Sequence, residues 1–176
     1  MLDETTRDEI GPQLRTMQII VAALCIGVIV FAVYLLVTGT ADEQPELGIL
    51  TFGAIGMAAV NAIISLIVPA FAISRQVQTI ANGTWQPSNQ QAVALSTDTG
   101  KLLAVYQTAL IIGSALLEGA AFFGLAAYMV EGHVAGLVVA GICLALILSR
   151  FPTRGRLELW LEDQLRRIKE QRQFTS

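Results

Sequence analysis

Glu118 is the residue of this sequence with the clearest potential for chemistry, because it is the single formal charge in the apolar run 102–130. The hydrocarbon core of a bilayer takes about 20 apolar residues of helix, so this run can span it with Glu118 near the middle. An ionisable side chain at that depth costs at least about 2.5 kcal/mol and often marks a site for an ion or a proton. Glu118 is therefore the first candidate functional residue.

Three further polar side chains are placed to act with Glu118. Gln107 and Ser114 precede it, and the successive spacings of 7 and 4 residues put all three on one face of a helix. Asn61 lies at a similar depth in the second apolar run, 47–73. Glu118 could bind and release a proton or sodium ion with these oxygens around it. Alternatively, a neutral Glu118 could hydrogen-bond Asn61 or a neighbouring subunit, and the lack of a basic partner favours this second interpretation.

Residues 115–126, with the sequence ALLEGAAFFGLA, resemble the carboxylate helix of the rotor-ring proteolipids, the c and K subunits of rotary ATPases. That family has a glycine-rich helix, a polar cytoplasmic loop and a returning helix with a mid-membrane Glu or Asp. The resemblance implies that Glu118 is an ion carrier. The second apolar run differs from the family's tandem glycine pattern, since it has only Gly48, Gly53 and Gly56.

The elements that must position these residues are membrane helices, since 54% of the 176 residues are hydrophobic, 14% are charged and the apolar residues fall in long blocks. We expect an all-α integral membrane protein with a bundle of four transmembrane helices and a C-terminal amphipathic helix. The expected parts are a polar N-terminal segment (1–16), a transmembrane domain (17–149) with spans 17–37, 47–73, 102–130 and 134–148 around a polar loop (74–101), and a C-terminal helix and tail (150–176).

Small residues give the second span a face for close helix packing. The spacings of 4, 3 and 4 residues align Ala54, Ala58, Asn61 and Ser65 on one side of a helix. Membrane helices approach one another through such faces, because lipid tails are as apolar as the side chains and helix association therefore depends on close packing.

The distribution of basic residues predicts the topology. The short connections 38–46 and 131–133 contain no Lys or Arg, and all eleven lie in the other polar segments. With four spans those segments share one face, which the positive-inside rule makes cytoplasmic. We therefore expect an inner (plasma) membrane protein with both termini in the cytoplasm.

The C-terminal segment has apolar residues at helical spacing, namely Leu157, Leu161, Leu165 and Ile168. Its charges include two favourable pairs, Glu162 with Arg166 and Asp163 with Arg167. Such a helix can lie on the membrane surface, bind a partner, or dock on its own bundle. Anionic lipid is a possible partner of this basic segment. Five residues are expected at the membrane interface: Trp85, Trp160, Arg150, Arg154 and Arg156.

No pattern of enzyme chemistry is present in the sequence. It has one His and lacks HExxH, GxSxG and P-loop motifs, so we expect no catalytic, cofactor or metal site. Cys25 and Cys143 lie in apolar runs and are expected to be small buried hydrophobes. Basic residues beside the membrane give no support for nucleic-acid binding. The favoured function is a structural or accessory subunit that forms a homo-oligomer or joins a larger membrane complex; the alternative is a proton- or sodium-translocating subunit that uses Glu118.

Overall fold

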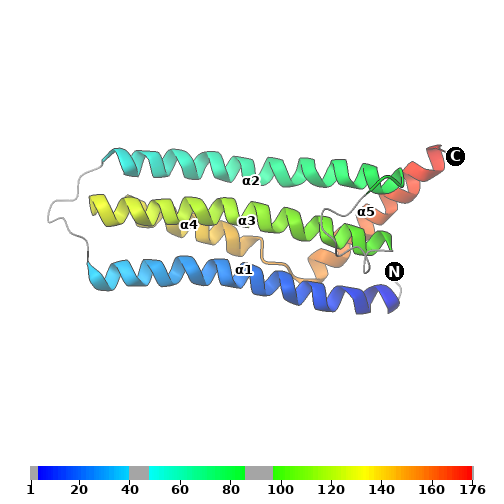
Figure 1. The fold of residues 1–176 in the computed structure, drawn as a ribbon, viewed down its shortest axis with the longest axis horizontal. Helices are drawn as coiled ribbons and strands as arrows, with labels where there is room; N and C mark the ends of the chain where they lie inside the picture. Colours follow the sequence, from blue (N-terminus) through cyan, green and yellow to red (C-terminus); the bar gives the residue numbers. More distant parts are fainter. Residues whose placement is uncertain (1–3, 40–47, 86–96, 176) are drawn as a thin grey trace. The chain divides into compact units, whose positions relative to one another are not determined.

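The computed structural model describes residues 4–39, 48–85 and 97–175, and the only regular secondary structure in these ranges is α-helix (Figure 1). Three of the helices are long and apolar enough to cross a membrane, and a fourth crossing arises only if α4 and α5 count as one span. The helices are α1 (Glu4–Thr38), α2 (Ile49–Ala81), α3 (Asp98–Glu131), α4 (Ala135–Ser149) and α5 (Arg154–Thr175).

The length of α4 explains why the structure supports three spans by length where the sequence predicts four. At 15 residues, α4 extends about 22 Å, which is less than the ~30 Å hydrocarbon core. The three long helices instead exceed their predicted spans. Helix α1 already begins at Glu4, α2 continues to Ala81 and α3 begins at Asp98, so helix also occupies both ends of the interval 74–101.

The chain divides into two compact units. Unit 1 contains residues 1–18, 68–110 and 152–176, and unit 2 contains residues 19–67 and 111–151. In unit 2 the long helices contribute residues 19–38, 49–67 and 111–131, each close to the ~20 residues that cross a hydrocarbon core. Helix α4 also belongs to unit 2 and α5 to unit 1.

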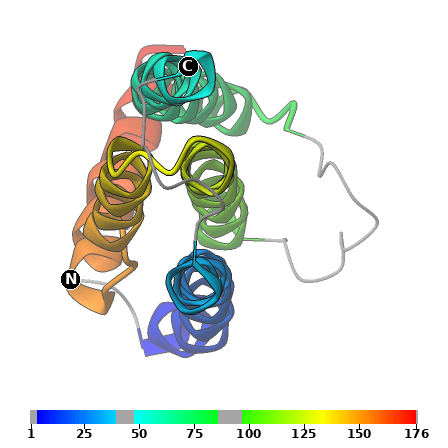
Figure 2. The same ribbon diagram turned by 90° about the vertical axis from the view of Figure 1, so that its left-hand side faces the viewer.

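Helix α3 is the central helix of unit 2, and Figure 2 shows it between α1 and α2. A cluster of apolar side chains joins it to α1 and α4: Val28, Leu35, Ala120, Ala121, Leu125, Val139, Ala140 and Cys143. Gly124 and Gly136 bring α3 and α4 especially close, because a Cβ on Gly124 would lie 2.9 Å from the carbonyl oxygen of Gly136. Gly132 has the positive φ of 66° that ends α3 and allows this tight hairpin.

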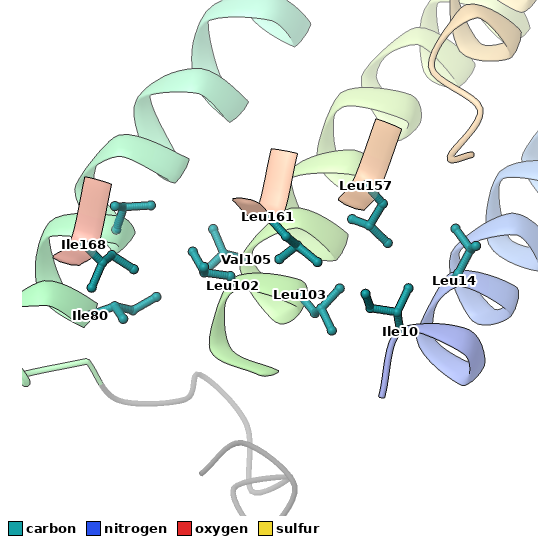
Figure 3. Close-up of a cluster of buried hydrophobic side chains, with 10 residues drawn as sticks. Ile10, Leu14, Ile80, Leu102, Leu103, Val105, Leu157, Leu161 and Ile168 are labelled. Atoms are coloured by element: carbon teal, nitrogen blue, oxygen red, sulfur yellow. The ribbon is translucent and has the colours of Figure 1, made fainter. Parts of the chain in front are cut away.

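Unit 1 has an apolar core of its own, drawn in Figure 3: Ile10, Leu14, Val77, Ile80, Leu102, Leu103, Val105, Leu157, Leu161 and Ile168. Leu157, Leu161 and Ile168 come from α5 and are almost completely buried. Helix α5 therefore docks on its own chain, which was one of the placements that the sequence left open. Leu102, Leu103 and Val105, predicted as the start of the third span, belong to this core.

We predict that Leu161→Ala destabilises the docking of α5 by about 2–5 kcal/mol, because it leaves a cavity in the unit 1 core. Leu159→Ala is the matched control, since Leu159 is 71% exposed on the same helix. Limited proteolysis of detergent-solubilised protein should release α5 faster from the Leu161 variant alone. Equal cleavage rates in the two variants would show that α5 is not held by this core.

Candidate functional site: polar side chains between the helices of unit 2

The polar residues singled out in the sequence fall in different units. Asn61, Ser114 and Glu118 belong to unit 2, whereas Gln107 belongs to unit 1. Ala54 and Ser65 are buried on the small-residue face of α2, and Ala58 and Asn61 are half-buried there. This face is therefore the packing face of α2.

Asn61 connects α2 to the backbone of α3. Its side-chain amide donates to the carbonyl oxygen of Leu116 at 3.0 Å. Its partner is thus a main-chain carbonyl, where the sequence suggested the carboxyl group of Glu118. A hydrogen bond of this kind replaces contact with lipid, in which an unpaired amide is costly.

Glu118 faces α1 at Gly27. A Cβ built on Gly27 would lie 3.6 Å from Oε1 of Glu118 and 3.6 Å from the ring of Phe122. The carboxyl group is half-buried and has no hydrogen-bond partner within the described ranges. The hydroxyl of Ser114, one turn earlier on α3, is fully buried and also lacks a partner there. Two polar side chains on successive turns of α3 thus lack a hydrogen-bond partner in the described part of the chain.

Arg150 connects the end of α4 to α2 through Ser65. Its Nη1 donates to the main-chain oxygen of Ser65 at 3.0 Å, and its Nη2 donates to the Ser65 hydroxyl at 2.9 Å. In a helix the carbonyl of residue 65 would accept from the N–H of residue 69, but residue 69 is proline and has no N–H. Arg150 therefore supplies the donor that Pro69 removes.

The Ser65 hydroxyl is oriented for this contact. It donates its own proton to the carbonyl oxygen of Ala62 at 2.8 Å, so its lone pairs are free to accept from Arg150. No carboxylate among the described residues pairs with Arg150. Desolvation lowers the pKa of the Arg150 guanidinium, which nevertheless stays charged at neutral pH.

Glu131 caps the first turn of α2 from the end of α3. Its two carboxylate oxygens accept from the backbone N–H groups of Leu50 at 2.8 Å and Thr51 at 2.9 Å, and from the Thr51 hydroxyl. The first N–H groups of a helix have no partner inside the helix, and a negative charge there is favourable. Gly48 leaves room for the carboxylate, because a Cβ at that position would overlap it.

Four of the five residues expected at the membrane interface, all but Arg150, lie in unit 1. The ring of Trp160 lies 5.0 Å from that of Tyr106, and Nε1 of Trp85 donates to the side-chain oxygen of Gln76 at 3.5 Å. Arg154 forms an ion pair with Glu158 at 2.8 Å. Arg156 is exposed.

Ion pairs line the exposed side of α5. The predicted pair between Asp163 and Arg167 is present at 3.0 Å, and Arg166 also pairs with Glu170 at 3.0 Å. The positive charges of this helix are thus partly balanced by its own acids. Exposed pairs of this kind contribute about 0–1 kcal/mol each.

Sequence reasoning assigned no role to Glu131 and treated Ser65 only as a small residue. For Ser65 a signal was present, since a proline four residues later in a membrane helix leaves one carbonyl without a donor. For Glu131 the nearest signal was a glycine beside the start of α2, which identifies neither the partner nor its helix.

We predict that Arg150→Gln destabilises unit 2 by about 1–3 kcal/mol, because it removes two charge-assisted hydrogen bonds. In a Pro69→Ala background the loss should be smaller, since the alanine introduced there can donate its N–H to the Ser65 carbonyl. The measurement is a double-mutant cycle of thermal unfolding in detergent micelles. If the two changes add within about 0.5 kcal/mol, Arg150 does not compensate for the proline.

We predict that Gly48→Ala costs about 1 kcal/mol, as is typical when a helix loses its N-terminal cap, because the new methyl group displaces the Glu131 carboxylate. Gly56→Ala is the control, since a Cβ there meets nothing within 4 Å. The same unfolding assay should show no further loss from Gly48→Ala once Glu131 is changed to Ala. A full, additive loss in that background would mean that Gly48 acts independently of Glu131.

No protein-family model, curated protein or solved structure matches the chain. The geometry of unit 2 accordingly carries the functional interpretation. It consists of three side chains that join helices, Asn61, Glu131 and Arg150, and two polar groups of α3, Ser114 and Glu118, that find no partner in the described part of the chain.

Proposed function

We propose that this protein is a non-enzymatic, multi-pass membrane protein that acts as a structural or accessory subunit of a membrane assembly. One observation carries the proposal: Asn61, Glu131 and Arg150 each hydrogen-bond the backbone of a neighbouring helix. Polar contacts of this kind hold membrane helices in a fixed arrangement. These three side chains hold helices in position, because each is hydrogen-bonded to backbone or hydroxyl groups of the protein itself.

The apolar surface of α2 supports a place in the membrane and in an assembly. Ile49, Phe52 and Leu66 are 88%, 63% and 66% exposed, and this helix is the least buried of the three candidate spans. Lipid tails or a further subunit, including a second copy of the chain, are the surroundings in which such a surface is stable. In this proposal α4 is a short fourth span, and both termini are cytoplasmic in an inner (plasma) membrane, as the distribution of Lys and Arg favours.

The second candidate function is a proton- or sodium-translocating subunit with Glu118 as the ion carrier. A specific observation favours it, namely that the Glu118 carboxyl and the Ser114 hydroxyl both lack a partner in the described structure. Oxygen atoms that the protein leaves free can receive a proton or a sodium ion. The resemblance of residues 115–126 to rotor-ring proteolipids supports the same role.

We predict that Glu118→Gln leaves folding and assembly intact and that neither wild type nor variant carries ions. The amide keeps the shape of the side chain but cannot exchange a proton. The measurements are flux under an imposed proton or sodium gradient in proteoliposomes, and the size of the native complex on a gel of solubilised membranes. Asn61→Leu is the positive control for assembly, because it removes the bond to Leu116 and should reduce the complex.

A flux that wild type shows and Glu118→Gln lacks would reject the structural role in favour of the ion carrier. Labelling of Glu118 by a hydrophobic carbodiimide gives an independent reading. Protection of that label by sodium would identify a sodium site, and a lack of labelling under all conditions would favour the structural role.

A further inference from the structure

Arg150 is a cation that the protein positions but does not neutralise. Several other basic side chains have acids beside them: Lys101 pairs with Asp98, and three arginines of α5 pair with neighbouring Glu or Asp. Arg150 instead hydrogen-bonds the neutral Ser65, and no carboxylate in the described ranges pairs with it. A half-buried guanidinium without a counter-charge is unfavourable unless an anion completes it.

The hydrogen bonds to Ser65 leave part of the guanidinium available. An arginine side chain has five N–H donors, and Ser65 takes one from Nη1 and one from Nη2. The remaining donors are Nε–H and the second N–H of each Nη. They lie in one plane whose orientation Ser65 fixes, and a planar guanidinium edge matches two oxygens of a phosphate group.

The contact with Ser65 sets the depth of Arg150 along α2. Glu131 binds α2 at Thr51 and Arg150 binds it at Ser65, so the two contacts are about 21 Å apart along the helix. The hydrocarbon core is about 30 Å thick, and arginine side chains extend toward its edge. With Glu131 at one surface of the membrane, Arg150 lies in the opposite half of the hydrocarbon core, about 9 Å from its far surface.

Exposed apolar side chains of α2 and α4 favour a lipid over a soluble anion. Leu66 on α2 and Leu148 on α4, close in sequence to the contact, are 66% and 51% exposed. In the proposed membrane placement, these exposed side chains of α2 and α4 meet acyl chains. Free phosphate would gain nothing from them.

On the basis of the membrane placement proposed above, we propose that the guanidinium of Arg150, anchored on Ser65, binds the phosphate of an anionic membrane lipid. The site lies between α2 and α4 of unit 2. It differs from a general basic surface on α5, where Arg154, Arg166 and Arg167 already have acidic partners.

The test is lipid binding by the full-length protein in detergent, measured as phosphatidylglycerol retained in native mass spectrometry. Phosphatidylcholine is the zwitterionic comparison. We expect Arg150→Gln to weaken phosphatidylglycerol binding about five- to tenfold, as one juxtamembrane charge is worth about 1 kcal/mol. Arg166→Gln, which removes a paired cation of α5, should bind as wild type does.

A second variant pair keeps the test valid if Arg150→Gln folds poorly. Pro69→Ala restores a donor to the Ser65 carbonyl, so Pro69→Ala with Arg150→Gln lacks the guanidinium but keeps that hydrogen bond. This double variant should lose phosphatidylglycerol binding while Pro69→Ala alone retains it. Equal binding by the two would overturn the proposal.

Two further outcomes are decisive. Competition by excess inorganic phosphate as strong as that by phosphatidylglycerol would overturn the lipid assignment in favour of a free-phosphate site. Equal binding of phosphatidylglycerol and phosphatidylcholine would show that lipid charge plays no part, and would also overturn the proposed anionic-lipid site. The membrane placement is tested separately by cell fractionation, and a protein that does not fractionate with membranes contradicts that placement. If the protein is membrane-bound but Arg150→Gln binds phosphatidylglycerol as wild type does, only the lipid site is contradicted.

Discussion

A backbone carbonyl without a helical donor is the constraint on which the arrangement of unit 2 depends. Pro69 leaves the oxygen of the buried Ser65 without a helical N–H donor inside α2. Arg150 meets this need and thereby fixes the end of α4 against α2. Asn61 and Glu131 attach α2 to α3 in the same manner, by bonding a side chain to backbone.

The two units are stabilised by different physical means. Unit 1 buries large aliphatic side chains from four helices, as a water-soluble domain does. Unit 2 exposes many of its large aliphatic side chains and packs its helices through small residues and polar bonds. The packing of unit 2 is the kind that lipid favours, because lipid removes the hydrophobic gain from helix association while it strengthens the demand for paired polar groups.

The sequence predicted the helical class, the small-residue face of α2 and the apolar stripe of α5, because each depends on residue type and helical period. It could not predict the partner of Asn61, since a main-chain carbonyl such as that of Leu116 has no sequence signature. Nor could it separate Leu102 and Leu103, which lie in the core of unit 1, from leucines that face lipid. Both kinds of leucine are equally apolar, and only tertiary contacts distinguish them.

The glycine contact between α3 and α4 bears on how the chain enters a membrane during synthesis. Helix α4 has 15 residues, so it offers a shorter apolar stretch than any of the three long helices. Gly124 and Gly136 let it lie directly against α3, and the turn at Gly132 joins the two without a long connection. With α4 as the proposed fourth span, insertion of α3 and α4 as one hairpin is favoured over insertion of α4 alone, and the glycines that permit contact in the finished fold also assist its insertion.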